Sequence, residues 1–164
     1  MKVVNIHHRV IQQPKEKIAQ LLSTLATKED KIWPYEKWPA IRFKKGLQLG
    51  ASGGHGPIKY TVTQHIPGEY IHFTFDKPTG FNGYHALKIK PIDENSTEIR
   101  HILKMNTTGI DILTWALTIR WLHDALIEDA FDKIENYFSK VEKVSSWGLW
   151  VKLWRKLLAP KAKS

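Results

Sequence analysis

The sequence predicts a single α+β domain, in which a meander of antiparallel strands precedes a long helix. Five strand-like runs lie at about 41–50, 57–66, 69–76, 82–91 and 97–106, and short segments rich in glycine, proline, asparagine and aspartate separate them. An apolar pattern with helical spacing then extends from about residue 110 to residue 144. The length of 164 residues and the apolar content of 42% suit one domain with a substantial core.

One strand and two helices are expected before the meander. Residues 3–11 have the pattern of a strand, and Pro14 begins a helix that ends near Leu25, because proline suits a first helical turn. Residues 26–40 contain two Trp-Pro pairs and are expected to be irregular, with a short helix around residues 27–32. The predicted order is therefore strand, two helices, five strands and a long helix.

Composition narrows the classes of protein and of site. The chain contains no cysteine, which excludes disulfides, thiol nucleophiles and zinc–thiolate sites. The amino-terminal segment lacks an unbroken apolar stretch, and no run approaches the roughly 18–20 apolar residues of a membrane span. We therefore expect a cytoplasmic protein. The basic residues near the carboxyl end, described below, add peripheral attachment to the inner face of the membrane as a second possibility.

The glycine-rich segment at the start of the meander is the most informative stretch of the chain. It reads Gly50-Ala-Ser-Gly-Gly-His-Gly-Pro-Ile-Lys-Tyr60, and glycine at this density supplies the positive φ angles of a tight strand connection. The segment resembles the loop between the second and third strands of birch-pollen-allergen-like proteins, which belong to the START/SRPBCC superfamily. Residues 53–60 and 123–129 are also similar to segments of uncharacterised bacterial members of that superfamily.

This resemblance implies a helix-grip fold over residues 1–144, in which a curved, six-stranded antiparallel sheet wraps around the long helix. It also implies a hydrophobic pocket between sheet and helix, with the loop residues Gly53, Gly54, His55 and Gly56 beside it. The implied function is the binding of a small hydrophobic or amphipathic ligand, similar to a lipid or a polyketide. Some relatives are polyketide cyclases or aromatases, so a cyclase-like enzyme is the alternative.

Strand alternation sorts the side chains that face this pocket. His85 shares a face with Leu87, His101 shares a face with Leu103, and His123 falls within the apolar stripe of the long helix. Three histidines are thereby expected in an otherwise apolar space. The predicted ligand-binding residues are Tyr60, Val62, Phe73, Phe75, His85, Leu87, His101, Leu103, Ile119 and His123.

These histidines have two interpretations. They are either core residues satisfied by hydrogen bonds or the polar anchors of a ligand in an apolar pocket. In the cyclase-like alternative, His85, His101 or Tyr60 would serve as general acid or base. No metal or other cofactor is expected, because the predicted register separates His85 and His101 by roughly 7–14 Å along the strands, too far for one zinc ion.

The remaining polar motifs carry weaker signals. Arg120, Asp124 and Glu128 are spaced by four and are expected to form a solvated row of ion pairs along the helix. His123 and Asp124 are neighbours on a helix and point about 100° apart, so we do not expect them to act as a relay. The glycine-rich segment lacks the Gly-Lys-Ser/Thr of a phosphate-binding loop.

The tail, residues 145–164, holds five basic residues and no acid, more than half of the net charge of +9. Its expected helix places tryptophans on one face and basic residues on the other, which suits an anionic membrane surface. The predicted membrane-binding residues are Trp147, Trp150, Trp154, Lys152, Arg155 and Lys156. Docking on the domain itself, or on a second subunit in a homodimer, is the alternative. A membrane-attached adaptor without a ligand is a third class of function, and nucleic acid is not expected as a partner.

Overall fold

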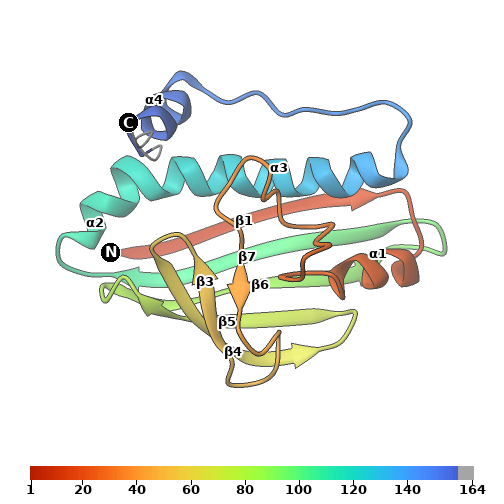
Figure 1. The fold of residues 1–164 in the computed structure, drawn as a ribbon, viewed down its shortest axis with the longest axis horizontal. Coiled ribbons are helices and arrows are strands. Elements are labelled where there is room, and N and C mark those ends of the chain that lie inside the picture. Colours follow the sequence, from red (N-terminus) through yellow and green to blue (C-terminus); the bar gives the residue numbers. More distant parts are fainter. Residues whose placement is uncertain (159–164) are drawn as a thin grey trace.

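The computed structural model describes residues 1–158 as a curved antiparallel sheet with a long helix packed across its concave face (Figure 1). The seven strands follow the order β1-β7-β6-β5-β4-β3-β2. They are β1 (Lys2–Ile11), β2 (Arg42–Phe43), β3 (Ser52–His55), β4 (Ile58–Ile66), β5 (Tyr70–Lys77), β6 (Phe81–Pro91) and β7 (Thr97–Thr107). The helices are α1 (Lys15–Leu22), α2 (Asp111–Thr114), the π-turn η1 (Trp115–Ile119), α3 (Arg120–Phe138) and α4 (Leu149–Leu158).

The predicted fold class is confirmed, but the sheet has seven strands where six were expected. The run 41–50 contributes only the two residues of β2, and the glycine-rich segment contributes the additional strand β3. A Cβ atom on Gly53 would lie 2.4 Å from the Arg42 carbonyl oxygen and 2.5 Å from the Phe43 ring. Glycine at this position therefore lets β2 and β3 approach closely, and the segment pairs as a strand.

One predicted helix is absent, and another is shorter than expected. Residues 27–32 form turns, because the Asp30 carboxylate accepts the backbone N–H groups of Ala26, Ile32 and Trp33 at 2.7–2.8 Å and so folds the chain back on itself. The long helix ends at Phe138 and not at residue 144. Residues 139–148 then run back along α3 without helical structure (Figure 1).

The core lies between the concave face of the sheet and α3. The predicted alternation is confirmed on β6 and β7, where His85, Ile89 and His101 are buried. On β4 it is correct at Tyr60 and Val62, but a bulge between Val62 and Gln64 turns Gln64 out to solvent. None of the helices within residues 1–158 is long and apolar enough to cross a bilayer.

A polar seam joins the edge strand β1 to α3. The β1 side chains that face α3 are polar, whereas Val4, Ile6 and Val10 on the opposite face are 40–54% exposed. We call this the β1–α3 seam, and it consists of Asn5, His7, Arg9, Asp124, Glu128, Asp132 and Glu135. Asp124 and Glu128 therefore pair with β1 and not, as expected, within a solvated row on the helix.

Asp129 on α3 forms a second polar junction, buried on the face away from β1. Its carboxylate accepts hydrogen bonds from Trp38 Nε1 at 2.7 Å, Trp147 Nε1 at 2.9 Å and Lys37 Nζ at 2.9 Å. The Arg155 guanidinium lies over the rings of Trp38 and Trp147, at 4.3 and 4.2 Å from their centroids. This Asp129 junction ties α3, the segment before β2 and the tail together.

We expect Asp129→Ala to lower the free energy of unfolding by about 2–5 kcal/mol, because two indole N–H groups lose their acceptor at a cost of about 1–3 kcal/mol each. Urea unfolding followed by tryptophan fluorescence measures this change. Glu142→Ala, at an exposed position beyond α3, is the control and should change stability by less than about 0.5 kcal/mol. A loss below 1 kcal/mol in Asp129→Ala would show that the junction is not a main support of the fold.

Candidate functional site

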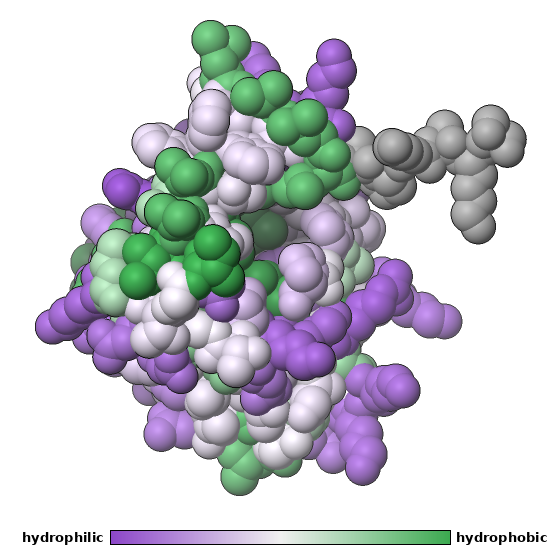
Figure 2. All heavy atoms as spheres, turned by 90° about the vertical axis from the view of Figure 1, so that its left-hand side faces the viewer, coloured by the Kyte–Doolittle hydropathy of each residue, from purple (hydrophilic) through white to green (hydrophobic). Residues whose placement is uncertain are grey.

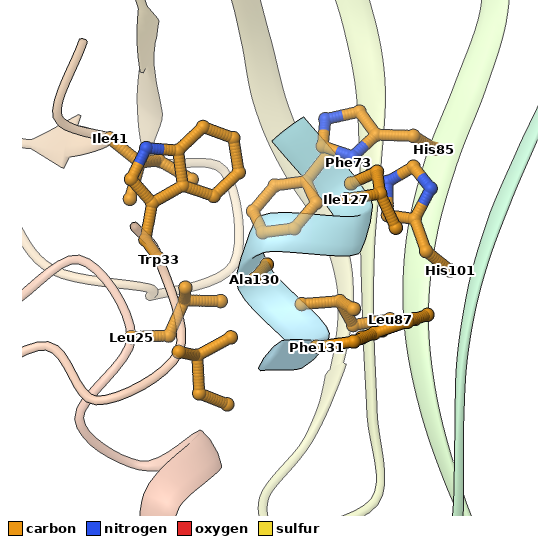
Figure 3. A pocket seen from close by; sticks show the side chains of 11 residues that line it. Leu25, Trp33, Ile41, Phe73, His85, Leu87, His101, Ile127, Ala130 and Phe131 are labelled. Atoms are coloured by element: carbon orange, nitrogen blue, oxygen red, sulfur yellow. Dashed lines mark hydrogen bonds between the residues drawn. The ribbon is translucent and has the colours of Figure 1, made fainter. Parts of the chain in front are cut away.

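The interior holds a small enclosed cavity between the sheet, α3 and residues 23–41, which we call the cover segment (Figure 3). Its volume is about 20 Å³, which is space for about one water molecule. Ligand pockets for drug-sized molecules are typically about 300–1,000 Å³. The cavity is lined by Leu25, Ile32, Trp33, Ile41, Phe73, His85, Leu87, His101, Ile127, Ala130 and Phe131.

Four of the predicted ligand-binding residues line this cavity, namely Phe73, His85, Leu87 and His101. The others lie elsewhere in the interior. Tyr60, Val62 and Leu103 are buried in the core, and Phe75, Ile119 and His123 are partly buried.

The cover segment supplies four lining residues that sequence reasoning missed. Leu25 and Trp33 in this segment project into the cavity opposite Phe73 and His85 (Figure 3). The segment is irregular, so no periodicity predicts which of its side chains point inward. The pairing of Trp33 Nε1 with the Pro39 carbonyl, at 2.9 Å, fixes how that indole lies.

Five histidines and one tyrosine form a continuous row across the concave face of the sheet. In spatial order the row runs His7, His123, His101, His85, Tyr60 and His55, with neighbouring ring centroids 4.5–5.9 Å apart. We call it the histidine row. His7 was not among the predicted site residues, and His55 was predicted beside the pocket but not within this group. The row extends beyond the cavity at both ends.

The expected separation of His85 and His101 is wrong. The register is as predicted, with Leu87 opposite His101, yet His85 Nδ1 and His101 Nε2 lie 3.4 Å apart. The two residues are diagonal neighbours on adjacent strands, and long side chains can lean toward each other over that distance. Spacing along the strand alone therefore overestimated the distance between the ring nitrogens.

The His85–His101 pair presents two free ring nitrogens. Within residues 1–158, His85 Nε2 and His101 Nδ1 are buried and have no hydrogen-bond partner. If His101 Nε2 donates to His85 Nδ1, the free His85 nitrogen is a donor and the free His101 nitrogen an acceptor; the opposite tautomers exchange these roles. In either neutral form the pair offers one donor and one acceptor.

Burial keeps most of the row neutral. Burial, with a smaller contribution from neighbouring histidines, holds the pKa values of His85 and His101 well below their usual range. Burial also lowers the pKa of His55 to about 3 and raises the pKa of Tyr60 well above its usual value. Burial therefore favours the neutral form of both His85 and His101 in the folded chain.

The other end of the row is charged. Burial lowers the pKa of His7, but hydrogen bonds with Asp124 and Glu128 outweigh this and raise it above its usual value. Burial raises the pKa of Asp124, but the nearby His123, together with hydrogen bonds from His7 and Asn5, outweighs burial and lowers it strongly. His7 is thus stabilised as an imidazolium between two carboxylates.

His7 was missed because β1 has two plausible faces. Apolar alternation predicts that the face with Val4 and Ile6 is buried, but in the structure these two side chains are exposed and the face with His7 is the more buried one. A second signal could have found it. Alternate strand residues are about 6.6–6.8 Å apart and every fourth helix residue about 6 Å apart, so Asn5, His7 and Arg9 match the helix acids in spacing.

The predicted site residues of the glycine-rich segment lie in β3 and in the turn after it. His55 of the glycine-rich segment faces the interior, with Nδ1 at 3.1 Å from the Tyr60 hydroxyl and its ring 4.8 Å from that of Trp33. Gly53 and Gly54 belong to β3, and Gly56 to the turn that follows.

In the tail, the predicted separation into a tryptophan face and a basic face is only partly correct. Trp147 docks at the Asp129 junction, and Trp150 and Trp154 donate to the Leu117 carbonyl at 2.8 and 3.0 Å. Lys152 and Lys156 are exposed. Arg155 instead lies in the docked interface, against Trp38 and Trp147.

Stability should fall steeply below about pH 6.5, the usual pKa of histidine. The unfolded chain then takes up protons that the folded chain excludes from His55, His85 and His101, each at about 1.4 kcal/mol per pH unit. His7 opposes this, because its raised pKa gives stability that is complete below pH 6.5 and is lost as pH rises through the folded pKa.

Urea unfolding between pH 6.5 and 4.5 tests this dependence. His101→Leu should reduce the slope by about 1.4 kcal/mol per pH unit. His8→Ala, at an exposed position on β1, should leave the slope unchanged. An unaltered slope in His101→Leu would show that His101 is protonated in the folded protein.

No family model matches the chain, and no curated protein matches it in sequence. Many solved structures are similar in fold, and three of them illustrate the likeness. Norcoclaurine synthase from Thalictrum flavum, solved with dopamine and hydroxybenzaldehyde, aligns with a TM-score of 0.61 and 12% identity over 87% of this chain and 90% of that chain. A protein from Thermobifida fusca aligns with a TM-score of 0.63 and 10% identity over 88% and 99%. A conserved protein of unknown function from Enterococcus faecalis aligns with a TM-score of 0.61 and 12% identity over 96% and 85%.

At these identities the likeness establishes the fold alone. Norcoclaurine synthase shares the helix-grip architecture, in which a curved sheet packs around a long helix, so the fold implied by the glycine-rich segment is confirmed.

Proposed function

We propose that the chain binds a small molecule with an apolar body and one hydroxyl or carbonyl group, placed against the His85–His101 pair. The observation that carries this proposal is the pair of free, buried ring nitrogens in the wall of an otherwise apolar cavity, within the part of the chain that the structure describes. Buried polar atoms without partners are costly, and a ligand group that hydrogen-bonds to them recovers that cost.

The size of the cavity sets a condition on binding. A volume of about 20 Å³ accommodates nothing larger than a water-sized group, so a larger ligand must displace the cover segment. Trp33 is the largest side chain that this segment places in the cavity wall (Figure 3). Its indole is a two-ring group, so a two-ring ligand matches the volume that Trp33 would vacate.

The test compares 2-naphthol with naphthalene, which differ only in the hydroxyl group. Fluorescence titration should show that the protein prefers 2-naphthol by about tenfold, the effect of about one hydrogen bond. Trp33→Ala should bind both probes more tightly. Adding His85→Leu together with His101→Leu should remove the preference for 2-naphthol, because either histidine alone still presents a free ring nitrogen.

Two results would contradict the proposal. One is no binding of either probe, even by Trp33→Ala. The other is a preference for 2-naphthol that survives the double substitution His85→Leu, His101→Leu. Native mass spectrometry of the unaltered protein provides an independent readout, because a retained small molecule adds a defined mass that His101→Leu should diminish.

A second proposal, that the protein attaches to anionic membranes, is favoured by an exposed apolar surface. Figure 2 views the end of the molecule where α2, η1 and α4 lie and where hydrophobic side chains gather. We call this surface the apolar end. Its members are 44–85% exposed and comprise Ile110, Leu113, Leu117, Trp121, Leu149, Trp150, Leu153 and Leu157.

The positive charge of α4 favours an anionic lipid surface over a second copy of the chain as the partner of the apolar end. Lys152 and Lys156 are exposed on α4 beside the apolar end, and residues 145–158 include no acid. Two copies meeting through this surface would bring these lysines together, which like charges oppose. An anionic lipid surface instead attracts each lysine by about 1 kcal/mol.

Sedimentation with phosphatidylcholine vesicles containing phosphatidylglycerol tests attachment. Leu149→Glu with Leu153→Glu should reduce the bound fraction at least tenfold without disturbing the docked side of α4, because both side chains face solvent. Ile92→Glu is the matched control, since Ile92 is 55% exposed in the β6–β7 turn at the opposite end of the sheet. Lys152→Glu with Lys156→Glu should weaken binding most at low salt.

Unchanged vesicle binding in the Leu149→Glu, Leu153→Glu variant would refute attachment through this surface. Light scattering after size exclusion distinguishes the other occupant. A dimer that the same variant dissociates would assign the apolar end to self-association instead.

A further inference from the structure

A second candidate site lies in the β1–α3 seam, apart from the cavity. His7, His123 and Asp124 each bring one potential metal-ligand atom to a point where all three lie within 4.8 Å of one another. His7 Nε2 is 3.1 Å from Asp124 Oδ1, and His123 Nδ1 is 3.5 Å from the same oxygen. Two imidazoles and a carboxylate are a donor set that first-row divalent metal ions bind, and the ion would displace the proton that His7 holds toward Asp124.

The spacing of these atoms suits one tetrahedral ion. Bonds of about 2.0–2.2 Å place the ligand atoms of a tetrahedral zinc site roughly 3.3–3.5 Å apart. The two distances at Asp124 Oδ1 already lie close to that separation. Only a small movement is needed, because the atoms come from two packed elements, β1 and α3, and not from a mobile loop.

Unmet hydrogen-bonding capacity points to an electron-pair acceptor at this place. Across residues 1–158, both ring nitrogens of His123 and Oδ1 of Asn5 are buried without a hydrogen-bond partner. The 3.5 Å contact between His123 and Asp124 does not meet hydrogen-bond geometry. The proton between His7 Nε2 and Asp124 Oδ1 forms no hydrogen bond with His123 or with Asn5 Oδ1, so the lone pairs of these two groups stay unpaired. A cation could accept both lone pairs.

The surrounding contacts orient the donors. His7 Nδ1 lies 2.8 Å from Glu128 Oε1, and Arg9 holds the second oxygen of Glu128 at 2.6 Å. A carboxylate on the far nitrogen of a histidine is the usual support of a metal ligand, and it directs His7 Nε2 toward Asp124. Asn5 Nδ2 donates to Asp124 Oδ1 at 2.8 Å and positions that carboxylate.

We propose that His7, His123 and Asp124 bind one divalent transition-metal ion of the zinc type, with Asn5 Oδ1 or water in the remaining position. A surface hollow of about 290 Å³, lined by residues 1–5, Trp115, Ala116 and Arg120, reaches Asn5 and offers an entry path. The proposal does not depend on the cavity or on the ligand proposed for it. The site lies at the charged end of the histidine row.

The untagged full-length chain, treated with a chelator and dialysed, is titrated with Co²⁺ and then with Zn²⁺. We expect one Co²⁺ per chain, with visible absorption bands that stoichiometric Zn²⁺ abolishes, and calorimetry should show one Zn²⁺ site. His7→Ala, His123→Ala and Asp124→Asn should each weaken Zn²⁺ affinity by at least 100-fold. His8→Ala is the matched control, because His8 neighbours His7 but is exposed on the opposite face of β1.

Nitrogen NMR of ¹⁵N-labelled histidine separates loss of ligand from loss of structure. Zn²⁺ should shift the ring nitrogens of His7 and His123 and leave those of His55, His85 and His101 unchanged. Asp124→Asn preserves side-chain shape, and its circular dichroism should match that of the unaltered protein. The proposal is overturned by the absence of a stoichiometric metal site, by unweakened binding in the folded Asp124→Asn variant, or by shifts confined to other histidines.

Discussion

The need to satisfy the buried carboxylate of Asp129 constrains the structure more than any other single interaction. An unpaired charge in the interior is costly, so the fold must bring donors to it from outside α3. Trp38 and Lys37 arrive from the cover segment and Trp147 from the tail. Their convergence fixes the cover segment over the cavity and fixes α4 beside α3. The closed cavity and the position of the apolar end are both consequences of this one requirement.

The histidine row changes in character along its length, and the side chains around each histidine explain the change. His85 and His101 lie among apolar side chains and stay neutral, while His7 lies between two carboxylates and stays charged. The neutral pair can exchange only hydrogen bonds with a bound molecule. The charged end, with its excess of carboxylates, attracts a cation. Adjacent parts of one row are therefore suited to different ligands.

The sequence was sufficient for the central strands of the sheet, but not for β2 and β3 at its edge or for the site. Strongly alternating runs identified the inward faces of β6 and β7, and with them His85 and His101. On β1 the more apolar face is the exposed one, because α3 presents acids to this edge strand and selects its polar face. The contacts of His7 and of Trp33 depend on how distant elements pack, which periodicity within one segment does not describe.

The pairing of β1 with β7 has a consequence for how the chain folds during synthesis. Ile11 pairs with Thr97 and Lys2 with Asn106, so about one hundred residues separate the partners. At translation rates of about 5–20 residues per second, β1 waits roughly 5–20 s for its partner strand. During that interval Val3 and Ile11, as well as the outward Val4, Ile6 and Val10, lack the sheet that later surrounds them. β1 thus stays without its neighbouring strand until β7 has been made.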